Sequence, residues 1–147
     1  MRGEAELRGE RGGDRVERMR PELRLRGVRG AVQIERDDAA AILIGAAELL
    51  QDLVAANGIR EEDVVSVFFS TTADLTAAYP AQAARQLGWH RVALFGAQEQ
   101  TVAGALPRVI RVLIHWQTAR AQDEIQHVYL GEAARLRPDR EQKEEES

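Results

Sequence analysis

Arginines flanked by apolar residues are the feature of this sequence best suited to binding an anion. Arg111 stands in the run VIRVLIHW, where strand alternation places it with Val109 and Leu113 on one face. A guanidinium in dry surroundings needs an anion, and a planar carboxylate is its natural partner. The alternative is an edge-strand arginine that reaches solvent, which fits a strand apolar on both faces less well.

A second arginine with a similar setting is Arg29, in RGVRGAVQIERD (26–37). Its same-face neighbours Gly27 and Ala31 are small, so a ligand could approach the backbone there. Arg26 lies three residues earlier and faces the opposite way, so the two cannot share one site without a bulge. We therefore expect Arg29 to bind the ligand and Arg26 to be structural or solvent-paired.

The remaining charged candidates are ambiguous from spacing alone. Ala81 and Arg85 are one helical turn apart, with Gln82 nearby, but a solvated helix face has the same pattern. Glu99 lies in a loop beside a strand end, and Arg137, in LRPD, could be a plain surface charge.

Several kinds of chemistry find no support. The chain has no cysteine, and His90, His115 and His127 lack metal-ligand spacing. Ser66 and Ser70 carry no nucleophile-elbow signature, and no glycine loop for phosphate binding occurs. General acid–base catalysis stays open.

Composition points to one soluble domain. The 147 residues are 44% hydrophobic and carry a net charge of −4, which favours neither nucleic acid nor an acidic membrane as partner. No apolar run reaches the ~18 residues of a membrane span, and no signal-peptide core is present. We expect a cytoplasmic protein.

The charge pattern divides the chain into three parts. Residues 1–24 have almost nothing to bury, and 139–147 form an acidic tail, so both are expected to be disordered. Residues 25–138 are the expected folded domain.

Periodicity and turn signals predict alternating strands and helices within this domain. The expected strands are 25–34, 64–72, 91–95 and 107–118; the expected helices run from Asp37 or Asp38 to Asn57, from 80 to 87, and in the later part of 122–136. The order βαβαββ then helix implies an α/β (α+β) fold, one mixed sheet with helices on one face. The other face has no cover, which a homo-oligomer would supply. The residues alone thus indicate a small protein that binds a compact anion, a dicarboxylate by preference, without naming a reaction.

Five separated motifs carry a family resemblance. They are RGVRGAVQIERD, DVVSVFFSTTADLTAAYPAQAARQLGW, AQE, LPRVIRVLIHWQT and QHVYLGEAARLRPD. Together they resemble the trimeric α/β class of chorismate mutases (AroH type) over residues 26–139. The N-terminal extension has no counterpart in that pattern.

The resemblance implies an isomerase that converts chorismate to prephenate in phenylalanine and tyrosine biosynthesis. Such enzymes use no cofactor, no metal and no covalent intermediate. Three subunits form a pseudo-α/β-barrel, with each active site in a cleft between neighbours.

The resemblance also implies roles for individual residues. Arg29 binds a substrate carboxylate and assists the ether oxygen, Arg111 places positive charge on that oxygen, and Glu99 accepts the ring hydroxyl. The remaining substrate-binding positions of that subunit are Tyr129, which contacts a carboxylate, Leu136, and Arg137, which closes over the site. The adjacent subunit supplies Tyr79, Ala81 and Arg85.

Two departures from the family pattern concern the rim of the site. Gly96 replaces a frequent cysteine near the ring hydroxyl, and Gln82 stands where a lysine can appear. Both changes suggest weaker attraction of substrate and leave room for a neighbouring substrate.

Two alternatives remain at this stage. One is a trimeric deaminase or hydrolase of the Rid type, which also has inter-subunit clefts and a carboxylate-binding arginine. The other is a non-catalytic module that binds a small anionic metabolite on the same scaffold.

Overall fold

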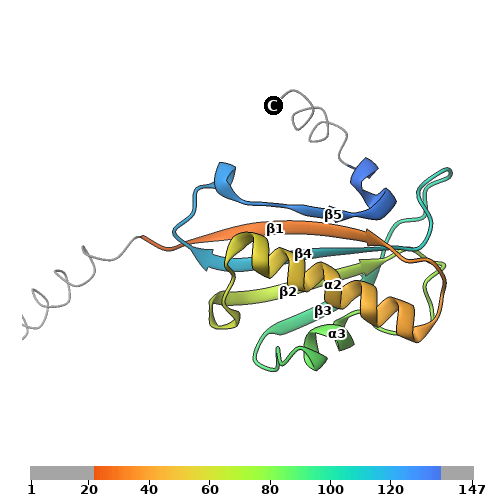
Figure 1. The fold of residues 1–147 in the computed structure, drawn as a ribbon, viewed down its shortest axis with the longest axis horizontal. Helices are drawn as coiled ribbons and strands as arrows, with labels where there is room; N and C mark the ends of the chain where they lie inside the picture. Colours follow the sequence, from red (N-terminus) through yellow and green to blue (C-terminus); the bar gives the residue numbers. More distant parts are fainter. Residues whose placement is uncertain (1–21, 137–147) are drawn as a thin grey trace, which may run out of the picture.

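A mixed five-stranded sheet with two helices on one face makes up the computed structural model, which describes residues 22–136 (Figure 1). In chain order the elements are β1 (Arg24–Gln33), α2 (Ala39–Asn57), the 3₁₀ turn η1 (Glu61–Asp63), β2 (Val64–Thr71), α3 (Ala81–Gln86), β3 (Ala93–Gln98), β4 (Val109–Thr118), η2 (Gln122–Glu124), β5 (Val128–Leu130) and η3 (Gly131–Leu136). The segments expected to be disordered, 1–24 and 139–147, lie outside the described residues except for 22–24, where Arg24 already begins β1.

The strand order across the sheet is β3-β2-β4-β1-β5. The central strand β4 runs antiparallel to both β1 and β2, while the edge strands β3 and β5 run parallel to β2 and β1. Segments far apart in sequence therefore meet at the centre of the sheet, and the two arginine-bearing strands β1 and β4 are neighbours.

Helix α2 builds the core on one face of this sheet. Asp38 is its N-cap, with Oδ1 accepting the Ala41 N–H at 2.7 Å, and Gly58 ends the helix at φ 65°. This resolves the choice between Asp37 and Asp38 that the sequence left open. The fully buried side chains of this layer include Ile42, Leu49, Leu50 and Leu53 from α2 and Val28, Val67, Ile110 and Ile114 from the strands.

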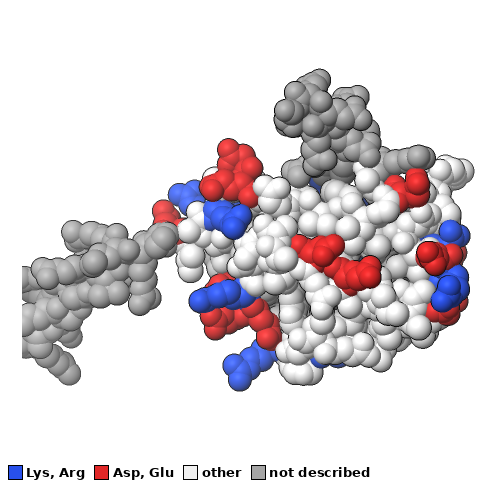
Figure 2. Space-filling view, in the orientation of Figure 1, with Lys and Arg blue, Asp and Glu red and all other residues white. Residues whose placement is uncertain are grey.

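Long and apolar, α2 could span a membrane by length and by its mean hydropathy of 1.7. Its buried side instead packs on the sheet, as in the core helix of a folded domain. Glu48 and Asp52 are exposed on its outer side, and Figure 2, which views this face, shows acidic atoms over the helix.

The opposite face of the sheet is largely open. Leu25, Phe68 and Phe95 are exposed on it, with Phe95 at 61%. The expectation that the described chain leaves this face uncovered is confirmed, apart from one corner. There η3 packs on the sheet, and Ala133 joins Ala31 and Val109 in a small second apolar cluster.

The main differences from the sequence-based prediction concern the two edge strands. Strand β5 was not predicted, because its three residues are too few for a pattern and it is a strand only through pairing with β1. The third strand was predicted at 91–95, but β3 runs from Ala93 to Gln98, since parallel pairing with β2 continues to Thr71.

Candidate active site

Strand register places several candidate residues in two rows across the open face. In one row Arg29 lies opposite Leu113, which lies opposite Phe68. The next row contains Ala31, Arg111, Ser70 and Ala97 from β1, β4, β2 and β3. Tyr129 of β5 continues this second row, because it pairs with Ala31.

The second row includes an ion pair. Arg111 Nε lies 2.7 Å from Glu99 Oε1, and the Ser70 hydroxyl donates to the same oxygen at 3.2 Å. Glu99 is held in place because it follows β3 directly and its N–H donates to Thr71 O at 2.8 Å. A fixed guanidinium and a fixed carboxylate thus stand side by side on a sheet surface.

Arg111 is not in the dry surroundings that its apolar neighbours suggested. Its side chain is 48% exposed and that of Glu99 is 23% exposed. The reason is that Arg111, with its same-face neighbours Val109 and Leu113, points to the sheet face that α2 and α3 leave open.

A hollow of about 250 Å³ lies on this face. Among its lining residues are Arg29, Ser70, Phe95, Arg111, Tyr129 and Leu136. The structure therefore brings together four of the predicted site residues (Arg29, Arg111, Tyr129 and Leu136), with Glu99 bound to Arg111 at the edge. One wall is apolar: Phe68 and Phe95 meet edge-on with ring centroids 6.0 Å apart.

The other predicted residues line a different hollow, on the helix side of the sheet near β3. This hollow has a volume of about 880 Å³ and is lined by Tyr79, Ala81, Gln82, Arg85 and Gly96, among others. Tyr79 is 80% exposed, and Arg85 is also exposed. One chain thus presents two half-sites, each with part of the predicted set.

The segment that leads to Tyr79 is tied to the start of α2. Asp37 accepts N–H bonds from Thr76 and Ala77, at 2.9 and 3.0 Å, and the Thr76 hydroxyl at 2.7 Å. These bonds lower the pKa of Asp37 below its ordinary value, and the bond from the Thr76 hydroxyl has the largest effect. The charged carboxylate is therefore the form that holds this loop.

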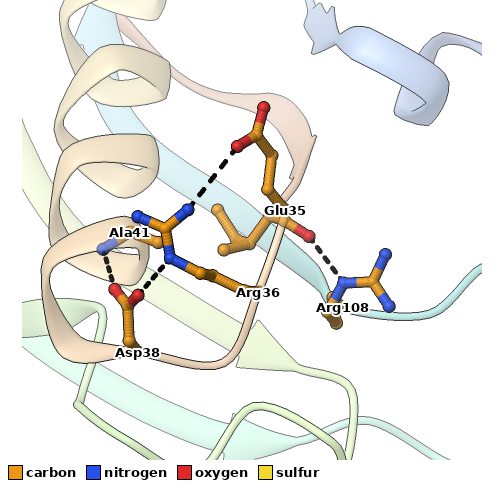
Figure 3. Close-up of polar contacts among 6 residues, drawn as sticks. Glu35, Arg36, Asp38, Ala41 and Arg108 are labelled. Carbon is orange, nitrogen blue, oxygen red and sulfur yellow. Dashed lines mark hydrogen bonds and ion pairs between the residues drawn. The ribbon is translucent and has the colours of Figure 1, made fainter.

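A second set of bonds fixes the start of β4, three residues before Arg111. The Arg108 N–H donates to both carboxylate oxygens of Asp74, at 3.1 and 3.0 Å, and its Nε donates to Ile34 O at 2.8 Å (Figure 3). Arg108 has φ 52°, an unfavourable conformation for an arginine that these bonds maintain. Figure 3 also shows Arg36 bonded to Asp38 and near Glu35 at the start of α2.

Arg26 and Arg29 lie on opposite faces, as predicted. Arg26 Nε donates to the carbonyl of Arg120 at 3.1 Å, which makes it a structural residue. Arg29 lines the hollow on the open face.

The three histidines lie in different settings. His90 is exposed in the loop before β3, His115 Nδ1 lies 3.2 Å from the Ser66 hydroxyl, and His127 Nδ1 accepts the N–H of Arg29 at 2.9 Å. No group of three or more potential metal ligands occurs among residues 22–136.

Some residues of the site were missed, and one lies beyond the structure. Ser70, Phe68 and Phe95 reach the site through cross-strand register, which a single sequence does not display. His127 was weighed only as a metal ligand. Arg137 lies outside the described residues.

The fold and the site together define a small α/β protein with a pocket on an open sheet face that two arginines line. Residues 25–140 match the family model for chorismate mutase type I. The chain is 54% identical over 104 residues to the chorismate mutase AroH of Thermus thermophilus, covering 70% of this chain and 85% of that protein. It is 43% identical over 105 residues to the chorismate mutase AroH of Bacillus subtilis (strain 168), with 71% and 83% covered.

A solved structure agrees with these matches. A chorismate mutase from Clostridium thermocellum superposes with a TM-score of 0.75 at 39% identity, covering 76% of this chain and 99% of that one. The chain belongs to the chorismate mutase type I family. This result favours the resemblance over the Rid-type and binding-module alternatives.

Proposed function

We propose that this protein is a chorismate mutase that isomerises chorismate to prephenate by charge and shape, without a cofactor. The observation that carries the proposal is the Arg111–Glu99 pair, at 2.7 Å, in the same row as Tyr129 and one row from Arg29. Two cations, a phenol and two aromatic rings thus line one hollow, and the Glu99 carboxylate is bound to Arg111 at its edge.

The reaction needs no proton transfer. One C–O bond breaks and one C–C bond forms in a single pericyclic step, and negative charge grows on the ether oxygen in the transition state. Substrate must also be held in a compact, chair-like conformer that is rare in water. Preorganised cations and a fitted cavity meet both needs.

The residues predicted for the open-face half of the site have distinct parts in this step. Arg111 places its guanidinium at the ether oxygen, and it keeps its charge because arginine does not titrate near neutrality. Glu99 accepts the ring hydroxyl and orients Arg111. Arg29 and Tyr129 bind carboxylates, with Arg29 also near the ether oxygen. Leu136 adds apolar contact, and Arg137 is assigned the closing position.

The complete site is assigned to an interface between copies. A homotrimer would lay the helix-side hollow of one chain, with Tyr79, Ala81, Gln82, Arg85 and Gly96, against the open face of the next. Two features support this arrangement: the predicted residues divide between two hollows, and the open face exposes large apolar side chains. The same assembly would cover Phe68 and Phe95. We assign the enzyme to the cytoplasm, in aromatic amino acid biosynthesis.

The experiment is to mix purified protein with chorismate and follow the loss of the diene absorbance of chorismate. Prephenate should appear in equal amount by NMR. Arg91→Ala, an exposed arginine before β3, serves as a matched control and should turn over at the wild-type rate. Binding of chorismate without turnover would contradict the proposal and favour a binding module.

A further inference from the structure

A side chain that the proposed mechanism does not use contacts the backbone of Arg29. His127 Nδ1 accepts the Arg29 N–H at 2.9 Å, across a separation of 98 residues. Regular pairing of β1 with β5 spans only Gly30↔Val128 to Val32↔Leu130. The ring therefore accepts a hydrogen bond from β1 one residue before the paired segment.

The segment before β5 is also anchored on its other side. Asn57, 2% exposed at the end of α2, accepts the Gln126 N–H at 2.8 Å and donates to the Gln126 carbonyl at 2.8 Å. Gln126 is thus fixed to the helix and His127 to the sheet. Such anchors matter because β5 is an edge strand of three residues and has few ladder bonds of its own.

We propose that His127 is a positioning residue for the carboxylate-binding end of the active site. Its Nδ1 fixes the Arg29 backbone to the start of β5, and so fixes the Arg29 side chain relative to Tyr129, two residues after His127. The inference rests on the proposed function, because the proposed function assigns Arg29 and Tyr129 to substrate carboxylates. His127 itself need not touch substrate.

Two substitutions separate the Nδ1 contact from the rest of the ring. In His127→Asn, Oδ1 is the same number of bonds from the backbone as Nδ1, so it can accept the Arg29 N–H. In His127→Gln, the acceptor lies one bond farther out, near the position of Nε2. We expect Gln to raise KM for chorismate about three- to tenfold, the value of one net hydrogen bond, with kcat within about twofold. Asn should restore KM to near the wild-type value.

The split between KM and kcat distinguishes positioning from general damage. A purely structural defect would lower kcat in proportion to the folded fraction and leave KM unchanged. A lowered kcat with unchanged KM would overturn the proposal. So would equal effects of the Asn and Gln substitutions on KM, or wild-type kinetics in His127→Gln. His90→Gln, at an exposed histidine, is the matched control and should behave as wild type.

Amide hydrogen exchange at Arg29 tests the contact without substrate. We expect Arg29 exchange to be slow in wild type and in His127→Asn and faster in His127→Gln. Unchanged exchange in His127→Gln would refute the inference even if chorismate is turned over. Failure of wild-type protein to turn over chorismate would refute the proposed function instead, and the exchange result would still decide whether the histidine holds Arg29.

Discussion

Arg111 and Glu99 show how one contact can serve both folding and chemistry. Their 2.7 Å pair is partly exposed, so it adds little stability in the free chain, where exposed pairs are worth about 0–1 kcal/mol. Its value lies in holding a cation at a fixed place before substrate arrives. Glu99 in turn is fixed by Ser70 and by its own backbone bond to Thr71.

Replacing Arg111 tests its assigned role directly. We expect Arg111→Ala to lower kcat/KM by at least the ~10²–10³ that follows loss of one preorganised oxyanion donor. Steady-state kinetics would measure this, with Arg91→Ala as the control for loss of a surface charge. A loss below tenfold would show that Arg111 is not the charge stabiliser.

The pH profile tests the absence of a proton shuttle. We expect kcat to stay nearly constant from roughly pH 5.5 to 8.5, because the pericyclic step needs no general base and arginine keeps its charge. Initial rates at saturating chorismate would measure it. A bell-shaped profile would indicate acid–base chemistry.

At the scale of elements, β1 is the strand on which the site depends. It pairs with β4 on one side and β5 on the other, so it joins Arg111 to Tyr129 through Ala31. Gly30 allows this close approach: a Cβ there would lie 2.8 Å from both Val128 O and Leu49 Cδ1. The glycine is needed for space, since helix and edge strand both press against it.

Gly30→Ala should therefore destabilise the fold. We expect a loss of about 1–3 kcal/mol in the free energy of unfolding, typical of overpacking, because the carbonyl of Val128 is backbone and must move. Urea denaturation would measure the loss. Gly27→Ala in the same strand is the control, since its Cβ would meet Leu113 at 3.4 Å, an ordinary contact. Equal stability of the two variants would contradict the argument.

The Asp37 carboxylate ties the loop before α3 to the start of α2. Asp37 has its pKa lowered, chiefly by the Thr76 hydroxyl, so its charged form is the one favoured by folding. A lowered folded-state pKa adds stability above the unfolded value, about 3.9, that is lost as pH falls through the folded value. Asparagine resembles the protonated carboxylate.

Asp37→Asn should thus lower Tm at pH 7. Its difference from wild type should begin to shrink as pH falls to about 3.9, the unfolded value, and vanish only below the lowered folded-state pKa of Asp37. Thermal unfolding at several pH values would show this. Asp52→Asn, an exposed acid on α2, provides the comparison and should leave Tm close to wild type at pH 7. A constant difference at all pH values would mean that the charge of Asp37 is irrelevant.

At the scale of the whole molecule, the two faces of the sheet differ in what covers them. One face has α2 and α3 (Figure 1), and the other exposes Leu25, Phe68 and Phe95. If three copies cover this face, a buried charge there must weaken the assembly, because an unpaired buried charge costs about 3–5 kcal/mol.

Phe95→Glu should shift the protein from trimer toward monomer in sedimentation equilibrium. Ile44→Glu is a close control, because Ile44 is 60% exposed and Phe95 61%, but Ile44 lies on α2. We expect Ile44→Glu to leave the trimer intact. A wild-type monomer, or a trimeric Phe95→Glu, would contradict the proposed interface.

Local patterns in the sequence were enough to predict most elements of the fold. Asp38 and Asn57–Gly58 delimit α2 because caps act within a few residues. The alternation of side chains along a strand placed Arg26 and Arg29 on opposite faces of the sheet, because they are three residues apart. Family resemblance added chorismate, which the arginines alone could not name.

The features that depend on contacts between distant segments were decided only by the tertiary structure. Strand β5 exists through its pairing with β1, and Ser70 joins Glu99 and Arg111 through register across three strands. The exposure of Arg111 follows from which face the helices cover, and the link from His127 to Arg29 spans 98 residues. Sequence periodicity reports the direction of a side chain along its own strand, but not its neighbour on the next.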